Sequence, residues 1–187
     1  EENFRTNMLN PSAKLVANVF DEKIEKKSTR DGFGAGTVEA GKENANVVVL
    51  SADLKESTRA EWFEKEFPER FIEMGVAEQN MATVAAGLAA VGKIPFITSY
   101  AAFSPGRNYE QIRTTIALND VPVHVCGMHA GVSVGPDGAT HQMLEDVAMM
   151  RALPNMQVIN PMDSEEGRKA TVAVAKGRMP SYLRFGR

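Results

Sequence analysis

The chain has 187 residues, of which 43% are hydrophobic and 24% are charged, a composition typical of an ordinary globular protein. Its formal net charge of −3 gives no electrostatic basis for binding nucleic acid or an anionic membrane, and its longest apolar run, residues 81–91, is too short to span a bilayer. The one cysteine, Cys126, excludes a disulfide within the chain, and the N-terminus lacks the pattern of a signal peptide, so we expect a cytoplasmic protein.

The sequence predicts a helical extension over residues 1–27, followed by one domain over residues 28–187. In residues 12–27 apolar side chains recur at helical spacing, at Leu15, Val19 and Ile24. The next segment, residues 28–41, has cap-like residues, but its four glycines weaken the prediction of a helix there.

Beyond this segment, short apolar runs alternate with helical stretches. The predicted strands cover residues 47–50, 71–73, 94–99, 123–128, 158–160 and 181–185. The predicted helices cover residues 59–66, 77–91, 109–118, 141–153 and 164–176, and Ser164 is expected to cap the last of them. This alternation predicts an α/β fold: a parallel, doubly wound sheet of about six strands with helices on both faces.

Ligands of such sheets bind outside the carboxyl ends of the strands, so the residues that follow the strands are candidates for a site. Acidic, aromatic, histidine and arginine side chains occupy these places: Asp53, Glu78, Tyr100, Phe103, His129, Asp137, His141 and Arg187. Together they suit a small polar ligand that contains an aromatic ring.

Each candidate also has a structural interpretation. Glu78 at a helix N-terminus could simply complement the helix dipole, and His129 and His141 could be hydrogen-bonded structural residues. With Asp137 the two histidines could bind a metal ion, but their spacing matches no compact zinc signature, so we predict no metal site. The glycine cluster in residues 32–36 follows a charged stretch rather than a strand, which argues against a dinucleotide-binding loop.

Four segments, in this order, resemble the central pyrimidine-binding domain of transketolases. They are Ser51-Ala52-Asp53-Leu54, Gly75-Val76-Ala77-Glu78-Gln79-Asn80-Met81, Tyr100-Ala101-Ala102-Phe103 and Gly135-Pro136-Asp137-Gly138-Ala139-Thr140-His141-Gln142. The similarity extends over most of the chain, from about residue 28 to residue 187. The resemblance implies the pyrimidine module of the thiamine-diphosphate-binding fold.

For the cofactor, the resemblance implies that Glu78 hydrogen-bonds the ring nitrogen of the aminopyrimidine of thiamine diphosphate. Tyr100 and Phe103 would form the walls around that ring. The turn after Phe103 is one residue longer than the family pattern, so the third residue of the pocket stays open between Arg107 and Tyr109.

For the substrate, the resemblance implies that His129 and His141 hydrogen-bond the sugar hydroxyl and carbonyl oxygens and transfer protons there. Asp137 would accept a hydrogen bond from a hydroxyl of the donor sugar. The positions matched to the sugar phosphate are Arg30, Ser57 and Arg187, and Asp53 matches a position near cofactor and substrate.

The family's motif for magnesium and diphosphate, a Gly-Asp-Gly followed by an Asn, does not occur in the chain. We therefore expect a partner domain or subunit to bind Mg²⁺ and the diphosphate, in a homodimer or hetero-oligomer. The small-residue helix over residues 81–91 would suit packing at that interface. The chain would then be the C-terminal subunit of a split transketolase, a fragment, or a non-catalytic relative.

The implied reaction is the transfer of a two-carbon ketol unit between sugar phosphates in the pentose phosphate pathway. A 1-deoxyxylulose-phosphate synthase shares the Glu78 and Thr140-His141-Gln142 motifs, but synthases of this kind usually lack a counterpart of His129. The β subunit of a 2-oxoacid dehydrogenase has no equivalent of Asp137 or of the Thr-His-Gln run. A scaffold or regulatory subunit with the same fold stays open as the non-catalytic alternative.

Overall fold

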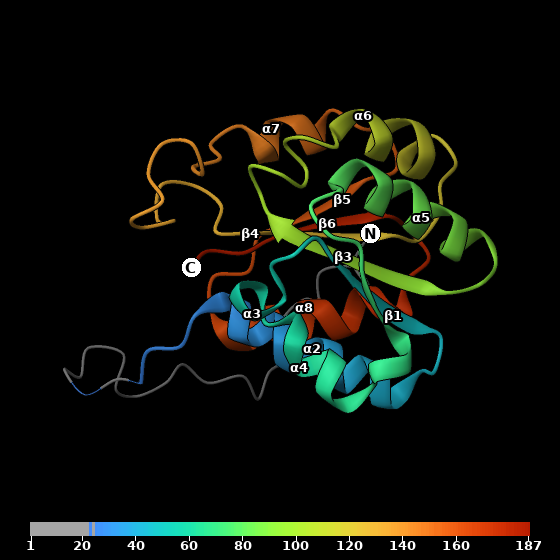
Figure 1. The fold of residues 1–187 in the computed structure, drawn as a ribbon, viewed down its shortest axis with the longest axis horizontal. Coiled ribbons are helices and arrows are strands. Elements are labelled where there is room, and N and C mark those ends of the chain that lie inside the picture. The colour runs from blue at the N-terminus through green and yellow to red at the C-terminus, as the bar shows by residue number, and fades with distance from the viewer. Residues whose placement is uncertain (1–22, 24) are drawn as a thin grey trace, which may run out of the picture.

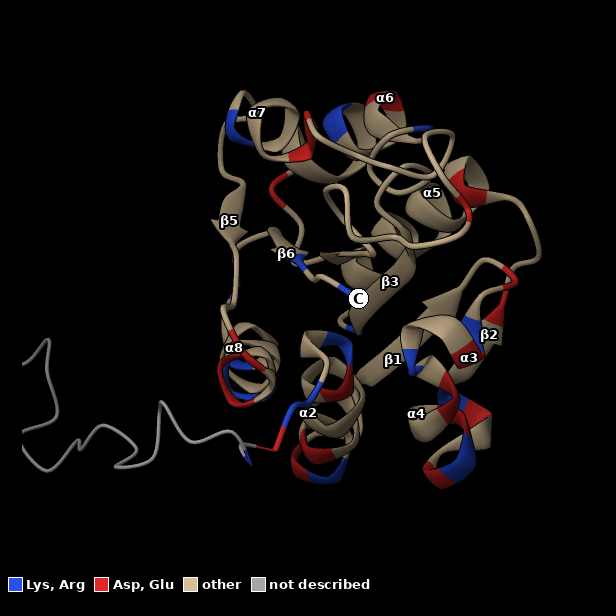
Figure 2. Ribbon diagram, turned by 90° about the vertical axis from the view of Figure 1, so that its left-hand side faces the viewer, with Lys and Arg blue, Asp and Glu red and all other residues tan. Residues whose placement is uncertain are grey.

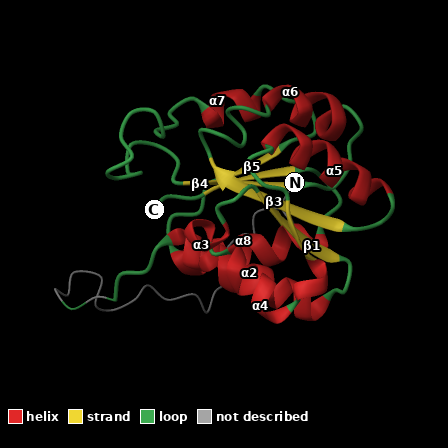
Figure 3. Ribbon diagram, viewed as in Figure 1, coloured by secondary structure: helices red, strands yellow, loops and turns green. Residues whose placement is uncertain are grey.

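The computed structural model describes Lys23 and residues 25–187, so the extension predicted over residues 1–27 lies almost entirely outside the described residues. The described chain forms three layers, a central sheet between two layers of helices (Figures 1 and 3). In this part of the chain no helix is long and apolar enough to cross a membrane.

The sheet has six strands, all parallel, in the order β2-β1-β3-β4-β6-β5. The strands are β1 (Val47–Ser51), β2 (Phe71–Glu73), β3 (Ile94–Tyr100), β4 (His124–Met128), β5 (Gln157–Ile159) and β6 (Ser181–Arg184). Every residue of β1 and β4 is buried, because helices cover both faces of a parallel sheet. The predicted fold class and the six predicted strands are confirmed, and each strand end lies within about one residue of its predicted position.

Each face of the sheet has its own hydrophobic core (Figure 1). One face is covered by α2 (Thr29–Glu43), α3 (Lys55–Thr58), α4 (Ala60–Glu66) and α8 (Ser164–Lys176). The other is covered by α5 (Glu78–Ala90), α6 (Tyr109–Gln111), the π-helix η2 (Ile112–Ala117) and α7 (Asp146–Arg151). A short 3₁₀ turn, η1 (Pro68–Arg70), leads into β2. Adjacent residues of β3 serve the two cores, since Phe96 packs on the α2 side and Ile97 on the α5 side.

The helix α2 departs from the sequence expectation, because its glycines do not prevent a helix of 15 residues. They are close-packing positions: a Cβ on Gly34 would lie 2.6 Å from the Trp62 ring, and one on Gly36 would lie 2.7 Å from Thr171 Cβ. A Cβ on Gly32 would clash with the carbonyl oxygen of Ser164. Close contact with α4 and α8 therefore outweighs the low helical propensity of glycine.

The predicted helix over residues 141–153 is also wrong in its first part, since α7 begins only at Asp146. The preceding residues form a loop, which is held by an isolated β-bridge. In this bridge the Gly131 amide donates to the Met143 carbonyl at 2.7 Å. The cap of α8 is Asp163 rather than Ser164, because the Asp163 side chain accepts from the Glu166 amide at 2.8 Å.

Candidate functional site

The predicted site residues lie along the edge of the sheet where the strands end. Figure 2 looks onto this edge, and the C-terminus lies near its middle, close to the start of α2. Glu78 opens α5 beyond β2, Tyr100 ends β3, His129 follows β4, and Arg187 follows β6. The parallel topology therefore places these residues along one edge, although they are far apart in the sequence.

Four predicted rings form one group. The rings of Tyr100 and Phe103 are nearly parallel, with centroids 6.1 Å apart and an interplanar angle of 9°. The His141 ring stands edge-on to Phe103 at 5.3 Å, and the His129 ring lies 4.1 Å from Tyr100. A tight turn after β3 explains the placement of the two aromatic rings, because the Phe103 amide donates to the Tyr100 carbonyl at 2.8 Å.

Glu78 joins this group as a buried carboxylate. Its side chain is 2% exposed, and its Oε2 accepts a hydrogen bond from Arg107 Nη1 at 2.8 Å. The Arg107 guanidinium lies over the Phe103 ring, 4.6 Å from the centroid. Asn108 Nδ2 donates to the Glu78 backbone carbonyl at 2.9 Å and to Ser104 Oγ at 3.1 Å. The loop after β3 therefore links the carboxylate to the aromatic walls.

Arg107 and Asn108 are site residues that the sequence did not identify clearly. Of the two residues left open for the third place in the pocket, Arg107 touches both Glu78 and Phe103. Tyr109 instead donates its hydroxyl hydrogen to the Met149 carbonyl at 3.1 Å, toward α7. The extra residue in the turn was a signal for Arg107, but no local pattern points to Asn108.

At the other end of the group, Arg30 holds His129. Arg30 Nη1 donates to the Ser57 backbone carbonyl at 2.9 Å and lies 2.9 Å from His129 Nε2. Because a guanidinium only donates, His129 Nε2 must accept, and the ring hydrogen is then on Nδ1. Burial, followed by the nearby charges of Arg30 and Arg187, lowers the pKa of His129 to about 4, so the imidazole is neutral at pH 7.

The long loop after His129 carries two further predicted residues. Arg187 Nη1 donates to the Val134 carbonyl in this loop, and Thr140 Oγ1 lies 2.8 Å from His141 Nδ1. Asp137 is exposed, in a turn closed by a bond of 3.2 Å from the Gly138 amide to the Gly135 carbonyl. Its charge opposes the lowering of the pKa of His129, which places it within electrostatic reach of that ring.

Asp53 stands apart from the ring group. Its backbone amide donates to Glu73 Oε1 at 2.8 Å, so it leans toward β2, on the side of β1 away from Tyr100. Ser57 lies close to Arg30 through its backbone carbonyl rather than its hydroxyl. Asp53 and Asp137 thus lie nearer the margins of the site. The other predicted residues contact one another or the long loop after His129.

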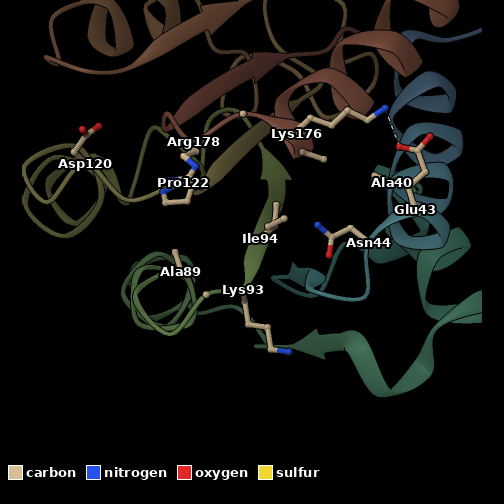
Figure 4. A pocket seen from close by; sticks show the side chains of 13 residues that line it. Ala40, Glu43, Asn44, Ala89, Lys93, Ile94, Asp120, Pro122, Lys176 and Arg178 are labelled. Carbon is tan, nitrogen blue, oxygen red and sulfur yellow. Dashed lines mark ion pairs between the residues drawn. The ribbon is translucent and has the colours of Figure 1, made fainter.

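The described residues contain no group of three His, Cys, Asp or Glu side chains placed to hold a metal ion. A hollow of about 790 Å³ lies at the opposite edge of the sheet, at the amino end of β3 (Figure 4). It lies between the last residues of α2, α5 and α8, and the ion pair of Lys176 with Glu43, 2.9 Å long, crosses one side. None of the predicted site residues lines it, so the hollow is separate from the candidate site.

Known proteins match this chain over the domain that the structure describes. The family profile described as "Transketolase, pyrimidine binding domain" matches residues 25–187. The "Putative transketolase C-terminal section" of Methanocaldococcus jannaschii is 48% identical over 161 residues, covering 86% of this chain and 51% of that protein. Human transketolase is 37% identical, over 87% of this chain and 26% of its own length.

Among solved structures, a "Split gene transketolase, inactive beta4 tetramer" superposes with a TM-score of 0.78 at 47% identity, over 87% of this chain and 52% of that one. The chain thus spans between a quarter and a half of the length of these relatives. The family profile covers all the residues that form the sheet, its two helical layers and the ring group. By its sequence, its fold and the residues at the edge of its sheet, the chain belongs to the transketolase pyrimidine-binding domain family.

Proposed function

We propose that this chain supplies the pyrimidine half of a thiamine-diphosphate site and, with a diphosphate-binding partner, transfers a two-carbon ketol unit between sugar phosphates. The observation that carries the proposal is the buried Glu78 carboxylate, which Arg107 links to the ring of Phe103 and so to its neighbour Tyr100. A buried carboxylate at a helix N-terminus needs a hydrogen-bonding partner. An aminopyrimidine is flat, and its ring nitrogen accepts a hydrogen bond from a carboxyl group that carries a proton, so it suits both Glu78 and the aromatic walls.

In this proposal Glu78 holds the ring nitrogen of the aminopyrimidine, while Phe103 and Tyr100 confine the ring between aromatic faces. Thiamine diphosphate, when bound, supplies the reactive carbon that carries the two-carbon unit. The contact of Asn108 with the Glu78 carbonyl holds the start of α5 in place.

The two histidines have complementary positions for proton transfer. His129 is neutral and its Nδ1 is buried without a hydrogen-bond partner among the described residues, so its N–H is proposed to donate a hydrogen bond to a substrate oxygen. His141 has Nδ1 against the Thr140 hydroxyl, which leaves Nε2 for another oxygen of the sugar. Asp137, on the exposed loop, is proposed to accept from a donor hydroxyl.

The phosphate of the sugar is proposed to bind at the cationic end of the site. Arg30 and Arg187 both lie close enough to His129 for their charges to lower its pKa. Each has a planar guanidinium suited to two-point contact with phosphate oxygens. Ser57, beside Arg30, and Asp53, toward β2, complete the predicted substrate side. Holding the phosphate there would orient the reacting carbons at the other end of the sugar.

We also propose that the chain works in an oligomer and that its partner binds Mg²⁺ and the diphosphate. Apart from Glu78, α5 carries no charged residue, whereas α2, α4 and α8 carry several (Figure 2). Its outward residues are small or uncharged, namely Gln79, Asn80, Thr83, Gly87 and Ala90. A Cβ on Gly87 would meet nothing within 4 Å among residues 25–187, so packing inside the described domain does not explain that glycine. Close approach of a second helix would explain it.

The need for a partner agrees with the related split-gene transketolase, which is inactive as a beta4 tetramer. The proposed setting is the pentose phosphate pathway in the cytoplasm. The lone cysteine, Cys126, is buried within the sheet, as suits a reducing compartment.

The test is a coupled assay of ketol transfer from xylulose 5-phosphate to ribose 5-phosphate, with thiamine diphosphate and magnesium. It is run on the chain alone and on the complex that the tagged chain captures from an extract of its source, with the partner identified by mass spectrometry. We expect activity only in the complex. Activity of the chain alone would contradict the need for a partner, and a captured partner without ketol transfer would favour the scaffold alternative.

Two matched variants of the complex locate the activity. Glu78→Gln should lower the rate by roughly 10²-fold or more, the size expected when a proton-transferring contact is lost. Glu110→Gln removes an exposed carboxylate on α6 and should leave the rate unchanged. A Glu78→Gln complex as active as the unmodified one would remove the cofactor assignment.

A further inference from the structure

The ion pair between Arg107 and Glu78 is unusually placed for a structural contact. Glu78 is 2% exposed, whereas Arg107 is 46% exposed and lies in the loop after β3 rather than in a helix or strand. The pair joins a fixed, buried carboxylate to a side chain that reaches it from the surface. A buried carboxylate without a counter-charge is strongly destabilised, so Arg107 has a clear role in this chain by itself.

The Arg107 guanidinium occupies the place that the proposed function assigns to the aminopyrimidine ring of the cofactor. The guanidinium is planar, lies over the face of Phe103 at 4.6 Å, and donates to Glu78 Oε2 at 2.8 Å. An aminopyrimidine held by the same carboxylate against the same ring would make both of these contacts. The two groups therefore compete for one carboxylate oxygen and one aromatic face.

We propose that Arg107 holds the place of the cofactor's aminopyrimidine in the unloaded domain and must leave Glu78 before the ring can bind. The inference rests on the proposed function, because it assumes that Glu78 and Phe103 receive that ring. The carboxylate is paired both before and after the exchange, first with Arg107 and then with the ring. The exposed side of Arg107 gives the guanidinium a path to solvent, and Asn108 keeps the Glu78 backbone in place during the exchange.

The ion pair is tested first on the chain alone, by thermal unfolding of Arg107→Gln, Glu78→Gln and the double variant. Arg107→Gln should lower the Tm, because Glu78 loses its counter-charge. The same change should have little effect in the Glu78→Gln background. Arg113→Gln, which removes an exposed arginine of η2, is the matched control and should leave the Tm unchanged. Additive effects of the two single changes would show that the pair is not formed and would overturn the proposal.

The competition is then tested in the assembled complex by calorimetric titration with thiamine diphosphate and magnesium. If Arg107 occupies the site in most unloaded molecules, Arg107→Gln should tighten cofactor binding by about tenfold, because affinity falls with the fraction of open sites. Unchanged or weaker binding by Arg107→Gln would overturn the proposal and make Arg107 a bystander or a wall of the loaded pocket. Arg113→Gln should bind as the unmodified complex does.

Cofactor binding by Glu78→Gln distinguishes failure of the proposed function from failure of the proposed competition by Arg107. If this variant binds the cofactor as tightly as the unmodified complex, the proposed function itself is wrong. If it binds more weakly while Arg107→Gln is unchanged, the cofactor assignment stands and only the competition by Arg107 is rejected.

Discussion

At the residue scale, this domain buries several polar side chains whose hydrogen bonding is incomplete. His124 Nε2, His129 Nδ1 and Asp146 Oδ1 are buried without a hydrogen-bond partner among the described residues. Asp146 is compensated on its other oxygen, which accepts from Tyr182 at 2.7 Å and from Arg184 at 2.8 Å. In the part of the chain that the structure describes, neither histidine ring has an acidic hydrogen-bond partner that would stabilise its protonated form. His124 contacts the Ser181 hydroxyl, and His129 faces Arg30. Because burial disfavours the charged form of each ring, the stability of the folded chain depends on pH.

Stability should fall as the pH is lowered through the range in which these histidines titrate. Burial lowers the pKa of His124 to about 3, and burial with nearby arginines lowers the pKa of His129 to about 4, both from 6.5. Both folded-state pKa values are below the unfolded value, so the unfolded chain takes up protons first. Stability is therefore complete above about pH 6.5 and is lost progressively below it.

Between pH 7 and pH 5 each histidine should contribute a loss on the order of 2 kcal/mol. Urea unfolding at the two pH values measures this loss. His124→Asn should remove about half of the difference, whatever its effect on stability at pH 7. An unchanged difference in that variant would show that His124 does not remain neutral in the folded chain.

Asp137 allows a second prediction at this scale, in the assembled complex. Asp137→Asn should lower the preference among donor sugars by roughly tenfold, the size expected for one hydrogen bond to a charged group. Binding of thiamine diphosphate should change little, because Asp137 lies on the exposed loop rather than beside Glu78. Asp120→Asn, at the opposite edge of the sheet, is the control. Ratios of kcat/KM for two donors measure the effect, and an unchanged ratio for Asp137→Asn would remove that residue from the site.

At the scale of elements, the helices use glycine in two different ways. The glycines of α2 let it lie directly against α4 and α8, and one of them, Gly32, faces a backbone carbonyl of α8. In α5, Gly87 faces outward, and a Cβ added there would meet no other described residue within 4 Å. Identical substitutions at the two positions should therefore have opposite effects on stability.

Gly32→Ala should destabilise the chain by about 1–3 kcal/mol, as overpacking of a tight contact does. Gly87→Ala should stabilise it by about 0.5–1 kcal/mol, because alanine is the better helix former and the added methyl group meets nothing. Urea unfolding of the two variants side by side measures both effects. A stabilised Gly32→Ala chain would show that α2 and α8 do not pack as closely as described.

At the scale of the whole molecule, the two helical layers differ in the charge of their outer surfaces. The layer of α2, α4 and α8 carries charged residues on its outer side, as a surface in contact with water does (Figure 2). On the other layer, α5 is outwardly uncharged, and Val76, just before it, is 70% exposed. This contrast supports assembly through the α5 layer.

Gly87→Leu should weaken that assembly, because the longer side chain separates helices that meet at a glycine. Ala173→Leu makes a comparable change at an exposed position of α8 and should leave the assembly unchanged. Sedimentation velocity over a range of concentrations measures both. Equal masses for the unmodified complex and for the Gly87→Leu chain mixed with the same partner would exclude α5 around Gly87 as the contact surface.

The sequence predicted the strands and the helices α5 and α8 well, for local reasons. Runs such as Val47-Val48-Val49-Leu50 contain enough apolar, β-branched residues to define buried strands, and α8 ends at the predicted residue. The strand ends then indicated the edge at which Glu78, Tyr100, His129 and Arg187 lie. The roles of these residues stay predictions that the variants above test.

What the local sequence could not predict depends on contacts between distant segments. The helix α2 forms despite its glycines because α4 and α8 lie against it, and the loop before α7 follows from the pairing of Met143 with Gly131. Local patterns of apolar residues and turns were enough to predict the strands of a parallel sheet and the edge that carries the candidate site, but not the order of the strands. The tertiary structure alone decided that Arg107 reaches Glu78 across 29 positions, because such a contact depends on how the loop after β3 meets the start of α5 and not on the residues beside either one.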